Sequence, residues 1–251
     1  MVNSQRSMVN LVIDIGNTLQ KLAVFDESGK IVKFLQEKQL SVSILEEVLA
    51  CYPVRSAIVS SVGKDDEELF RWLGCRVKLV RFSSECRLPI NMRYATPETL
   101  GTDRIANAVG ANALYPGENV LSIMAGTCLV ADFVNADGEY LGGSIAPGMR
   151  MRFQALSQFT ARLPLVDPES IDYFIGDDTR GSILSGVING MAREIDGLIA
   201  QYEEAFSGLK VLCSGGDSEL LQKFIKKRIF AAPNPTLFGL YKILVLNASE
   251  D

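Results

Sequence analysis

The sequence predicts an α/β protein made of two halves that open in the same way. Residues 11–30 read LVIDIGNTLQKLAVFDESGK, and residues 121–140 read LSIMAGTCLVADFVNADGEY. Each stretch has an apolar strand, a turn with Gly and Thr, a second apolar strand and a short Asp/Gly turn. Helical and extended patterns alternate afterwards, which is typical of an α/β layout. The repeat indicates a duplicated domain, with halves at 1–115 and 116–251. The alternative is two unrelated hairpins that share common turn residues.

The first half begins with strands, because short apolar runs alternate there with turn residues. A tight turn at Gly16-Asn17 separates the first two strands. A helix follows, then a buried strand ending in small residues, a helix with an acidic first turn, another strand and a helix opened by Gly101. The expected strands are Val9–Asp14, Lys21–Phe25, Ile31–Gln36, Ser56–Val62 and Cys75–Phe82, and the expected helices are Val42–Ala50, Asp65–Trp72 and Leu100–Leu114.

The second half begins again at Val120 with a strand, a turn and a strand. A glycine-rich turn, LGGSIAPG at 141–148, precedes a helix, and PLVDPES at 164–170 is a loop. A long periodic helix and a short strand follow, and the glycine turn of SGGDSELLQKFI, at 214–225, opens another helix. The expected helices are Met149–Gln158, Thr179–Phe206 and Leu237–Leu246, and the late strand is Lys210–Ser214.

Composition excludes several classes of protein. The 251 residues are 47% hydrophobic and 22% charged, which is ordinary for a soluble globular protein. No apolar run approaches the roughly 20 residues that cross a bilayer, and the start, MVNSQRSMVN, has no secretory apolar region, so we expect neither insertion nor export. We also expect the residues before Met8 to be dispensable for the fold. A net charge of −5 and a pI near 5.0 argue against nucleic-acid binding.

Cysteine and histidine usage narrows the chemistry further. The five cysteines are scattered without a CxxC pair, which predicts reduced thiols in a cytosolic protein. The sequence has no histidine, which excludes Ser-His and Cys-His hydrolases, HExxH metalloproteases and His-ligated zinc sites. Acid-base work then falls to Asp, Glu, Lys, Tyr or Cys. We therefore expect carboxylate and magnesium chemistry, or no chemistry.

The first candidate site is DIGNTLQK, from Asp14 to Lys21. A carboxylate ends a buried strand, and Gly-Asn-Thr then exposes main-chain N–H groups and a hydroxyl beside it. Amides, a hydroxyl and a lysine suit phosphate oxygens, while the carboxylate suits Mg²⁺, directly or through water. The alternative is a hairpin in which Asp14 only caps the turn. One motif of this kind leaves both interpretations open.

The second candidate site is LGTDRIANAVGA, at 100–111. The start of this helix leaves N–H groups that can face an anion or a polar substrate. Asp103 can accept a proton from a hydroxyl, and Arg104 can orient a carboxylate or phosphate. Taken alone, the motif is better explained as a helix start with Thr102 or Asp103 as N-cap and a surface Asp-Arg pair. The glycine turns GGSIAPG and SGGDSELL can approach a nucleotide, or simply allow positive φ.

These motifs gain weight together, because they occur in one order. DIGNT is followed by SSV at a strand end, Tyr94 before GTDR, the AGT hairpin with Asp132, GGxIxPG, Gly176–Thr179 and a late SGG. In this order the chain resembles the type III pantothenate kinases of the actin-like ATPase superfamily, from about Val9 to Asn247. The resemblance implies two ribonuclease-H-like halves, with mixed sheets flanked by helices and a nucleotide cleft between them. It also implies ATP-dependent phosphorylation of pantothenate to phosphopantothenate, the first step of coenzyme A synthesis.

The resemblance also assigns residues by position. It places Asp14 near Mg²⁺, makes Asp103 the general base on the pantothenate hydroxyl, and makes Thr179 a substrate contact in a site shaped by a homodimer interface. It implies a cytoplasmic enzyme that uses ATP, Mg²⁺ and a monovalent cation, K⁺ or NH₄⁺. The implied ATP-binding residues are Asp14, Ile15, Gly16, Asn17, Thr18, Leu19, Gln20, Lys21 and Thr127, and the implied substrate contacts are Tyr94, Gly101, Thr102, Asp103, Arg104 and Thr179.

The second hairpin departs from the family. Members usually read Asp-x-Gly-Thr there, with the aspartate as a ligand of the monovalent cation, whereas this chain reads MAGT at 124–127. A thioether suits K⁺ poorly, and the threonine usual three residues after Thr127 is Val130. Met124 also fits a purely structural role as a residue that fills core volume.

Three explanations of this departure are open. The cation site is lost while the kinase survives, or other oxygens hold the cation, such as main-chain carbonyls or Asp132. The third possibility is a non-catalytic nucleotide-binding or regulatory relative on the same fold. A kinase of another small hydroxyl-bearing metabolite is a further alternative function.

Overall fold

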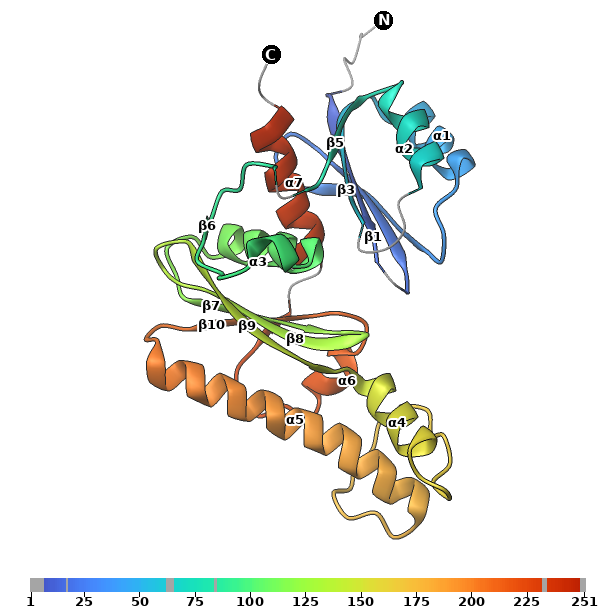
Figure 1. Ribbon diagram of the computed structural model, residues 1–251, viewed down its shortest axis with the longest axis vertical. Coiled ribbons are helices and arrows are strands. Elements are labelled where there is room, and N and C mark those ends of the chain that lie inside the picture. Colours follow the sequence, from blue (N-terminus) through green and yellow to red (C-terminus); the bar gives the residue numbers. More distant parts are fainter. Residues whose placement is uncertain (1–6, 17, 62–65, 84, 232–233, 249–251) are drawn as a thin grey trace, which may run out of the picture. The chain divides into compact units, whose positions relative to one another are not determined.

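The chain forms two compact units, which we describe separately. The computed structural model describes residues 7–16, 18–61, 66–83, 85–231 and 234–248 (Figure 1). Unit 1 comprises residues 1–114 and 235–251, and unit 2 comprises residues 115–234. Each unit contains a mixed sheet flanked by helices. The predicted α/β class with two mixed sheets is therefore confirmed.

Unit 1 is built on a five-stranded sheet in the order β3-β2-β1-β4-β5. β1, β2 and β3 pair antiparallel, whereas β4 is parallel to β1 and β5 is parallel to β4. The strands are β1 (Val9–Ile15), β2 (Gln20–Phe25), β3 (Ile31–Glu37), β4 (Val54–Ser61) and β5 (Lys78–Arg81), followed by the short β6 (Asn91–Met92) and the 3-10 helix η1 (Pro97–Thr99). The helices are α1 (Val42–Cys51), α2 (Glu67–Gly74), α3 (Thr102–Leu114) and α7 (Pro235–Ala248).

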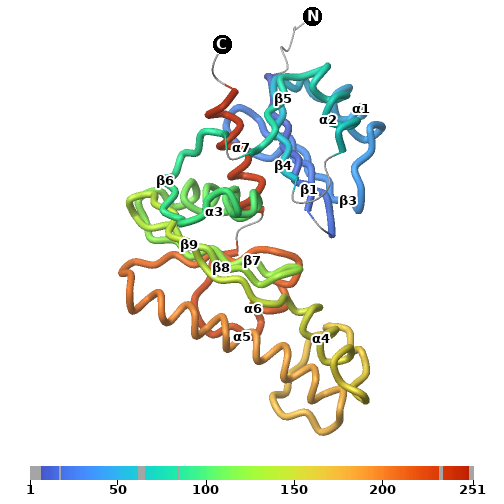
Figure 2. The backbone as a smooth tube through the Cα atoms, in the orientation of Figure 1, coloured from blue at the N-terminus to red at the C-terminus, as the bar shows by residue number. Residues whose placement is uncertain are grey.

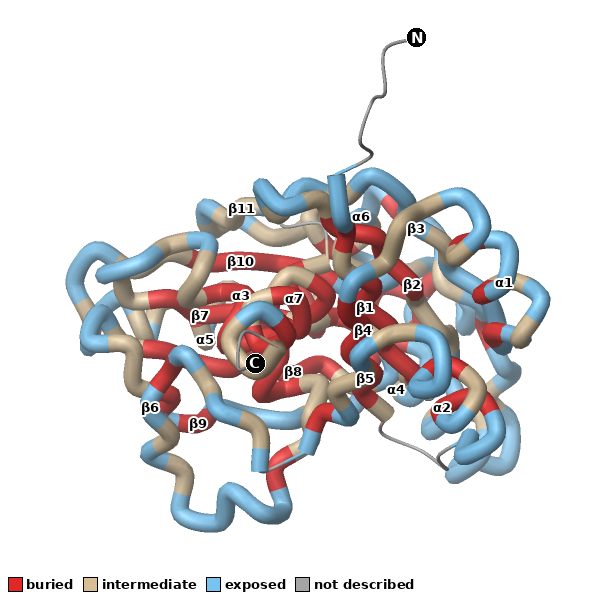
Figure 3. Tube along the Cα trace, turned by 90° about the horizontal axis from the view of Figure 1, so that it is seen from above, coloured by how far each residue is buried: buried red, intermediate tan, exposed pale blue. Residues whose placement is uncertain are grey.

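Side-chain alternation along β1 separates the two faces of the unit 1 sheet. Leu11, Ile13 and Ile15 are buried in one core with Leu45 of α1 and Leu73 of α2. The even-numbered residues of β1 lie on the opposite face, against which α7 packs. Figure 3 shows β1 and β4 buried along most of their length. A strand that is buried on both faces needs a nearly continuous run of apolar residues.

The last helix, α7, packs against α3, although the two helices lie far apart in the sequence (Figure 2). Glycines make this approach possible. A Cβ atom on Gly110 would clash with the main-chain carbonyl of Pro235, and one on Gly239 would clash with the carbonyl of Ala106. Backbone therefore meets backbone where the helices cross, and any larger residue would force them apart.

The placement of α7 differs from the expected organisation, which assigned residues 116–251 to one half. The boundary after Leu114 is close to the expected one, but residues 235–251 group with unit 1. The ring of Tyr241 stacks on Phe25 of β2 with centroids 4.6 Å apart, and its hydroxyl donates a hydrogen bond to the Asp26 carbonyl. These contacts, with the glycine crossing, hold α7 in unit 1. An apolar helical pattern does not reveal which sheet the helix covers.

The strands of unit 2 run in the order β11-β10-β7-β8-β9 within their sheet. β7, β8 and β9 pair antiparallel, while β10 is parallel to β7 and β11 is parallel to β10. The strands are β7 (Val120–Ala125), β8 (Cys128–Val134), β9 (Glu139–Pro147), β10 (Lys210–Ser214) and β11 (Phe230–Ala231), and the helices are α4 (Met149–Gln158), α5 (Thr179–Ala205) and α6 (Ser218–Gln222). A hairpin thus opens each unit, in agreement with the predicted duplication.

The core of unit 2 contains the inner face of the sheet and the apolar stripe of α5. Leu121, Ile123 and Phe133 of β7 and β8 are buried together with Leu184 and Ile188 of α5. Apolar residues recur along α5 at helical spacing, which is the pattern that predicted this helix. The even-numbered residues of β7 and β8 lie on the other face of the sheet.

One predicted turn is wrong. LGGSIAPG is predicted to be a glycine-rich turn, but residues 141–147 belong to β9, which pairs with β8. A Cβ atom on Gly143 would clash with the Ala131 carbonyl, so this glycine permits close strand approach and not a reversal of the chain. The other predicted elements are found with small differences at their ends, except that Val62 and Asp65 lie outside the described residues.

We predict that Gly239→Ala destabilises the protein, because the added methyl group would meet backbone atoms of α3. Overpacking of this kind typically costs about 1–3 kcal/mol, which denaturant unfolding would measure. Gly197→Ala in α5 is the matched control, since none of the described atoms lies within 4 Å of its added Cβ. Helix propensity alone should stabilise that variant by roughly 0.5–1 kcal/mol. Equal stabilities for the two variants would contradict the packing described here.

Candidate active site

Asp14 lies near the end of β1, where the first hairpin begins. The strand register places it beside Lys21 of β2 and beside Ser60 of β4. Residues in register carry their side chains on the same face of a sheet. A carboxylate, an ammonium group and a hydroxyl therefore lie in one row across three strands.

The hairpin after Asp14 contains all the other residues predicted to bind ATP except Thr127. Ile15 is buried in the core, so only its main chain can face a nucleotide. Gly16 is half-buried and Thr18 is exposed. The Gln20 side chain accepts a hydrogen bond from the main chain of Leu40 at 2.7 Å, which ties it to its own unit. Asn17, another predicted ATP-binding residue, lies outside the described residues.

The Asp14 carboxylate is strongly perturbed. It is only 8% exposed, and burial raises its pKa from 3.8 to about 6, with Lys21 lowering and Asp103 raising it. The influence of Asp103 shows that the two carboxylates lie within electrostatic reach of each other. A desolvated carboxylate with a second one nearby suits a hard cation with oxygen ligands, and Mg²⁺ commonly takes one or two carboxylates plus phosphate oxygens. The residues present therefore fit Mg²⁺.

The GTDR motif forms the start of α3. The carbonyl of Gly101 accepts hydrogen bonds from the N–H groups of Arg104 and Ile105. The Asp103 carboxylate accepts a 2.9 Å hydrogen bond from the Arg104 N–H, and a Cβ atom on Gly101 would lie 2.5 Å from it. A side chain at position 101 would therefore displace the Asp103 carboxylate. The Thr102 hydroxyl accepts a 3.0 Å hydrogen bond from the hydroxyl of Ser60, a residue of β4.

Tyr94 lies beside the same helix start. The Arg104 guanidinium is 5.8 Å from the centroid of the Tyr94 ring, and Arg104 is only 7% exposed. A guanidinium stacked near an aromatic face keeps its charge and its planar donors. The structure therefore joins Tyr94 to the GTDR motif, as the resemblance implied.

Thr127 occupies the turn of the second hairpin, in unit 2. Its main-chain carbonyl accepts a hydrogen bond from the Gly148 N–H, and the Ala125 carbonyl accepts one from the Asp217 N–H. A Cβ atom on Gly148 would clash with this turn, and one on Gly215 would clash with Ala125. The two glycine segments that seemed weak as separate motifs thus meet at the turn, which leaves Thr127 exposed.

Met124 belongs to a mainly apolar row beside that turn. Its register partners are Ser214 on β10 and Val130 on β8, and Val130 pairs with Ile145 on β9. The row thus contains one hydroxyl and three apolar side chains, while K⁺ prefers oxygen ligands. Among the described residues, no group of three or more Asp, Glu or Cys side chains is placed to hold a metal ion. The residues present do not fit the monovalent cation that the resemblance implied.

Asp132 does not fit as a replacement ligand. It pairs with Ser122 and lies two residues further from the turn along β8 than Val130. Its carboxylate is 1% exposed and accepts a 2.8 Å hydrogen bond from the hydroxyl of Tyr140. Asp132 therefore takes part in an internal bond of the sheet, away from the turn.

Thr179, the remaining predicted substrate contact, is the first residue of α5. Asp178 caps this helix through a hydrogen bond from the Gly181 N–H, and Thr179 is exposed. Within unit 1, the structure brings Asp14, Lys21 and the GTDR motif together. Within unit 2, it joins the turn at Thr127 to Gly148 and Gly215.

Sequence reasoning missed the contribution of Ser60, although it singled out the SSV motif. The hydrogen bond from Ser60 to Thr102 joins residues 42 positions apart. The available signal was a small polar residue at the end of a buried strand, but this pattern does not indicate which residue the hydroxyl bonds to.

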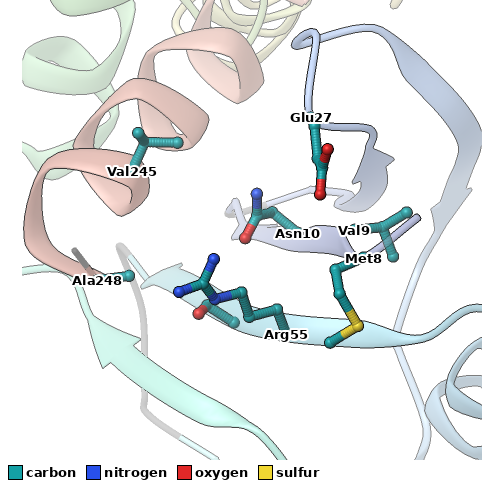
Figure 4. A pocket seen from close by; sticks show the side chains of 8 residues that line it. Met8, Val9, Asn10, Glu27, Arg55, Val245 and Ala248 are labelled. Carbon is teal, nitrogen blue, oxygen red and sulfur yellow. The ribbon is translucent and has the colours of Figure 1, made fainter. Parts of the chain in front are cut away.

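A cavity of about 130 Å³ lies in unit 1 at the start of β1, and it is lined by Met8, Val9, Asn10, Glu27, Arg55, Ser56, Val245 and Ala248. Figure 4 shows the side chains of Asn10, Glu27 and Arg55 around it. None of the predicted site residues lines this cavity, and Asp14 is near the other end of the strand. The cavity is thus separate from the candidate active site.

Comparison with known proteins adds independent information. The chain matches the family model for type III pantothenate kinase over residues 10–201. A protein named type III pantothenate kinase from Christiangramia forsetii is 43% identical over 243 residues, which cover 96% of this chain and 100% of the relative. One of the same name from Flavobacterium johnsoniae is 41% identical and covers 92% of this chain and 95% of the relative.

A solved structure supports the fold. The ROK family glucokinase from Streptomyces griseus, in complex with glucose and AMPPNP, aligns over 94% of this chain and 99% of its own, with a TM-score of 0.52 and 13% identity. At this identity the likeness concerns the fold alone.

We predict that Asp14→Asn stabilises the metal-free protein at neutral pH, measured by unfolding in the presence of a chelator. The folded-state pKa, about 6, lies above the unfolded value of 3.8. Below about pH 4 the carboxyl group is protonated in both states and does not destabilise the folded protein. Between about pH 4 and pH 6 its ionisation lowers the free energy of unfolding by an amount that grows to roughly 3 kcal/mol at most. The higher free energy of unfolding of Asp14→Asn should therefore be measurable at pH 7.5 and should vanish at pH 4.

Asp26→Asn is the control for this prediction. Hydrogen bonds from Ser28 and Lys30 lower the pKa of the Asp26 carboxyl, so this variant should lose stability at neutral pH. A loss of stability in Asp14→Asn at pH 7.5 would contradict the proposed desolvation of Asp14.

Proposed function

The chain belongs to the type III pantothenate kinase family, and we propose that it phosphorylates pantothenate at the site formed by Asp14 and the GTDR motif. The family reaction is the ATP-dependent phosphorylation of pantothenate in coenzyme A synthesis, so the chain is a kinase and uses ATP. The observation that carries the proposal is the buried Asp14 carboxylate within electrostatic reach of Asp103. One carboxylate is suited to a metal ion, and the other to the proton of the attacking hydroxyl.

Asp103 is the proposed general base. Its hydrogen bond from the Arg104 N–H fixes the carboxylate in the first turn of α3. The pantothenate hydroxyl oxygen attacks the γ-phosphorus, the bond to the leaving ADP oxygen breaks, and the hydroxyl proton passes to Asp103. An aliphatic hydroxyl is a very weak acid, so proton transfer comes late, as the new bond forms. Such a reaction depends on positioning and charge neutralisation and needs no histidine.

The two hairpins are the proposed nucleotide site. In the first hairpin, main-chain N–H groups and Lys21 are suited to the phosphates, and Asp14 would hold Mg²⁺. When bound, Mg²⁺ neutralises charge that develops on the phosphate oxygens. In the second hairpin, Thr127 offers an exposed hydroxyl, and glycine at 148 and 215 leaves no side chain over the turn.

Arg104 and Tyr94 are the proposed contacts to the carboxylate end of pantothenate. A buried guanidinium stays protonated and pairs well with a carboxylate, because its N–H donors match the two oxygens. The Tyr94 ring covers one side of this group. Thr102 and the main chain of Gly101 lie at the same helix start and complete the proposed contact set.

We also propose that the protein is a homodimer. Large apolar side chains are exposed in the segment between α4 and α5, namely Phe159 (82%), Leu165 (61%), Phe174 (79%) and Ile175 (71%). A monomer rarely leaves such a group in water. Thr179 follows this segment directly, so a subunit contact there would also shape its surroundings.

The loop that presents these side chains is held in place. The Ser185 hydroxyl donates a 2.5 Å hydrogen bond to the Phe174 carbonyl, and the Asn189 amide donates one to the Tyr173 carbonyl. A fixed loop with outward apolar residues loses little entropy when a second copy covers it. Light scattering of the wild type and of Phe174→Asp would show a dimer and a weakened dimer, respectively, if this loop is the interface.

We also propose that the protein is located in the cytoplasm. The five cysteines, all among the described residues, form no disulfide bond, which suits a reducing environment. Among the described residues, no helix has the length and apolarity needed to span a membrane.

The remaining alternatives differ in what they predict. A non-catalytic relative would bind ATP without transfer, and a kinase of another metabolite would prefer a different hydroxyl compound. Retention of Asp14, Asp103, Arg104 and Thr127 favours an active pantothenate kinase, because a decayed enzyme would be expected to lose some of them. ADP formation with pantothenate, compared with polyols and sugars, separates the three possibilities.

We predict that Asp103→Asn lowers kcat for pantothenate phosphorylation by about 100-fold or more, since general-base assistance typically contributes 10²–10⁴-fold. Asn retains the shape of the side chain and should leave the melting temperature close to that of the wild type. Asp137→Asn, in the turn between β8 and β9 of unit 2, serves as the control and should retain full activity. Unchanged turnover in Asp103→Asn would remove Asp103 from the mechanism.

We predict that the wild type is active without added K⁺, because the row around Met124 has no carboxylate to bind this cation. Pantothenate-dependent ADP formation should differ by less than about twofold between Na⁺, K⁺ and NH₄⁺ buffers. Met124→Asp, alone and with Val130→Thr, should create a dependence on K⁺, also visible as a K⁺-dependent shift of the melting temperature with ATP. Strong K⁺ activation of the wild type would refute the loss of this site.

A further inference from the structure

Ser60 is a buried hydroxyl to which the proposed mechanism assigns no role. It is 0% exposed, and its register partner on β1 is Asp14. Both side chains therefore lie on the face of the sheet opposite the core that contains Ile13 and Val59. A buried polar side chain needs a hydrogen-bond partner, and the partner of Ser60 belongs to another element.

The hydrogen bond from Ser60 joins the sheet to the first turn of α3. Its hydroxyl donates to Oγ1 of Thr102 at 3.0 Å. Thr102 is the first residue of α3, and Asp103 is the second. The first turn of a helix has N–H groups without intrahelical acceptors and frays most readily. This bond thus connects the strand pair that carries Asp14 to the turn that carries the proposed base.

The direction of this hydrogen bond has a chemical consequence. A hydroxyl has one hydrogen to donate and two lone pairs to accept. Because Ser60 is the donor, the hydrogen of the Thr102 hydroxyl is left to point elsewhere. Thr102 is then available as a donor to a substrate oxygen beside the Asp103 carboxylate, which acts as an acceptor. A donor at position 102 and an acceptor at position 103, in the same helical turn, match a hydroxyl group that must be both oriented and deprotonated.

We infer that Ser60 is a positioning residue for phosphoryl transfer: it holds Thr102 as a donor toward the substrate and fixes the first turn of α3 relative to Asp14. This inference rests on the proposed function. Ser60 acts through Thr102 and touches neither the substrate nor the metal ion. It is one of the buried groups on which the spacing of the two carboxylates depends.

The test compares Ser60→Ala with Ser56→Ala. Ser56 lies on the same strand and the same face and is equally buried, at 2% exposed, but it pairs with Asn10, at the other end of β1. Ser60→Ala should lower kcat/KM for pantothenate by about 10- to 100-fold, because small displacements of reacting groups have effects of this size. KM for ATP should change little, Ser60→Thr should retain most activity, and Ser56→Ala should resemble the wild type.

A double-mutant cycle with Thr102→Val shows whether Ser60 acts through Thr102. If it does, Ser60→Ala lowers activity much less in the Thr102→Val background than in the wild type, because the bond is already absent. An equal loss in both backgrounds, or kinetics of Ser60→Ala that match those of Ser56→Ala, would overturn the inference.

Hydrogen exchange tests the same inference without turnover. The amides of Arg104 and Ile105 are bonded to the Gly101 carbonyl, and their exchange reports on the first turn of α3. Ser60→Ala should accelerate this exchange, and Ser56→Ala should not. If the wild type phosphorylates no pantothenate, the proposed function fails, while unchanged exchange in Ser60→Ala would refute the positioning role separately.

Discussion

The crossing of α3 and α7 at Gly110 and Gly239 is the contact on which the rest of unit 1 depends. Without side chains at the crossing, backbone meets backbone, and α3 is held where its first turn can bond to Ser60. A larger residue at either glycine would displace the helix that carries Asp103. Gly110, further along α3, and Gly239 on α7 therefore determine the position of the proposed base, although neither takes part in the chemistry.

A second constraint is electrostatic, and it opposes stability. Burial leaves Asp14 with a raised pKa, so the carboxylate is held ionised at neutral pH at a cost to folding. Lys21 offsets part of this cost, and the proposed Mg²⁺ would offset more of it, which is the usual trade between stability and activity at functional sites. Unit 2 contributes differently: glycines confine its turn at Thr127, and its row at Met124 is mainly apolar.

The sequence predicted the local features of this protein better than its long-range contacts. Hairpins, glycine turns and the order of motifs are local, so the fold class and the family followed from them. The position of α7 and the bond from Ser60 to Thr102 depend on contacts between distant segments, which no local pattern specifies. LGGSIAPG was misread because glycine permits both a turn and close strand approach. The departure at Met124 was visible in the sequence, but its row with Ile145 required the register.

The most direct test of the account is the structure of the protein with pantothenate, Mg²⁺ and a non-hydrolysable ATP analogue. The measured quantity is the distance from the Asp103 carboxylate to the pantothenate hydroxyl that accepts the phosphoryl group. We predict a hydrogen bond of about 2.6–3.2 Å, with Mg²⁺ bound to Asp14 directly or through water. A hydroxyl bonded to another carboxylate, with Asp103 turned away from it, would contradict the central claim.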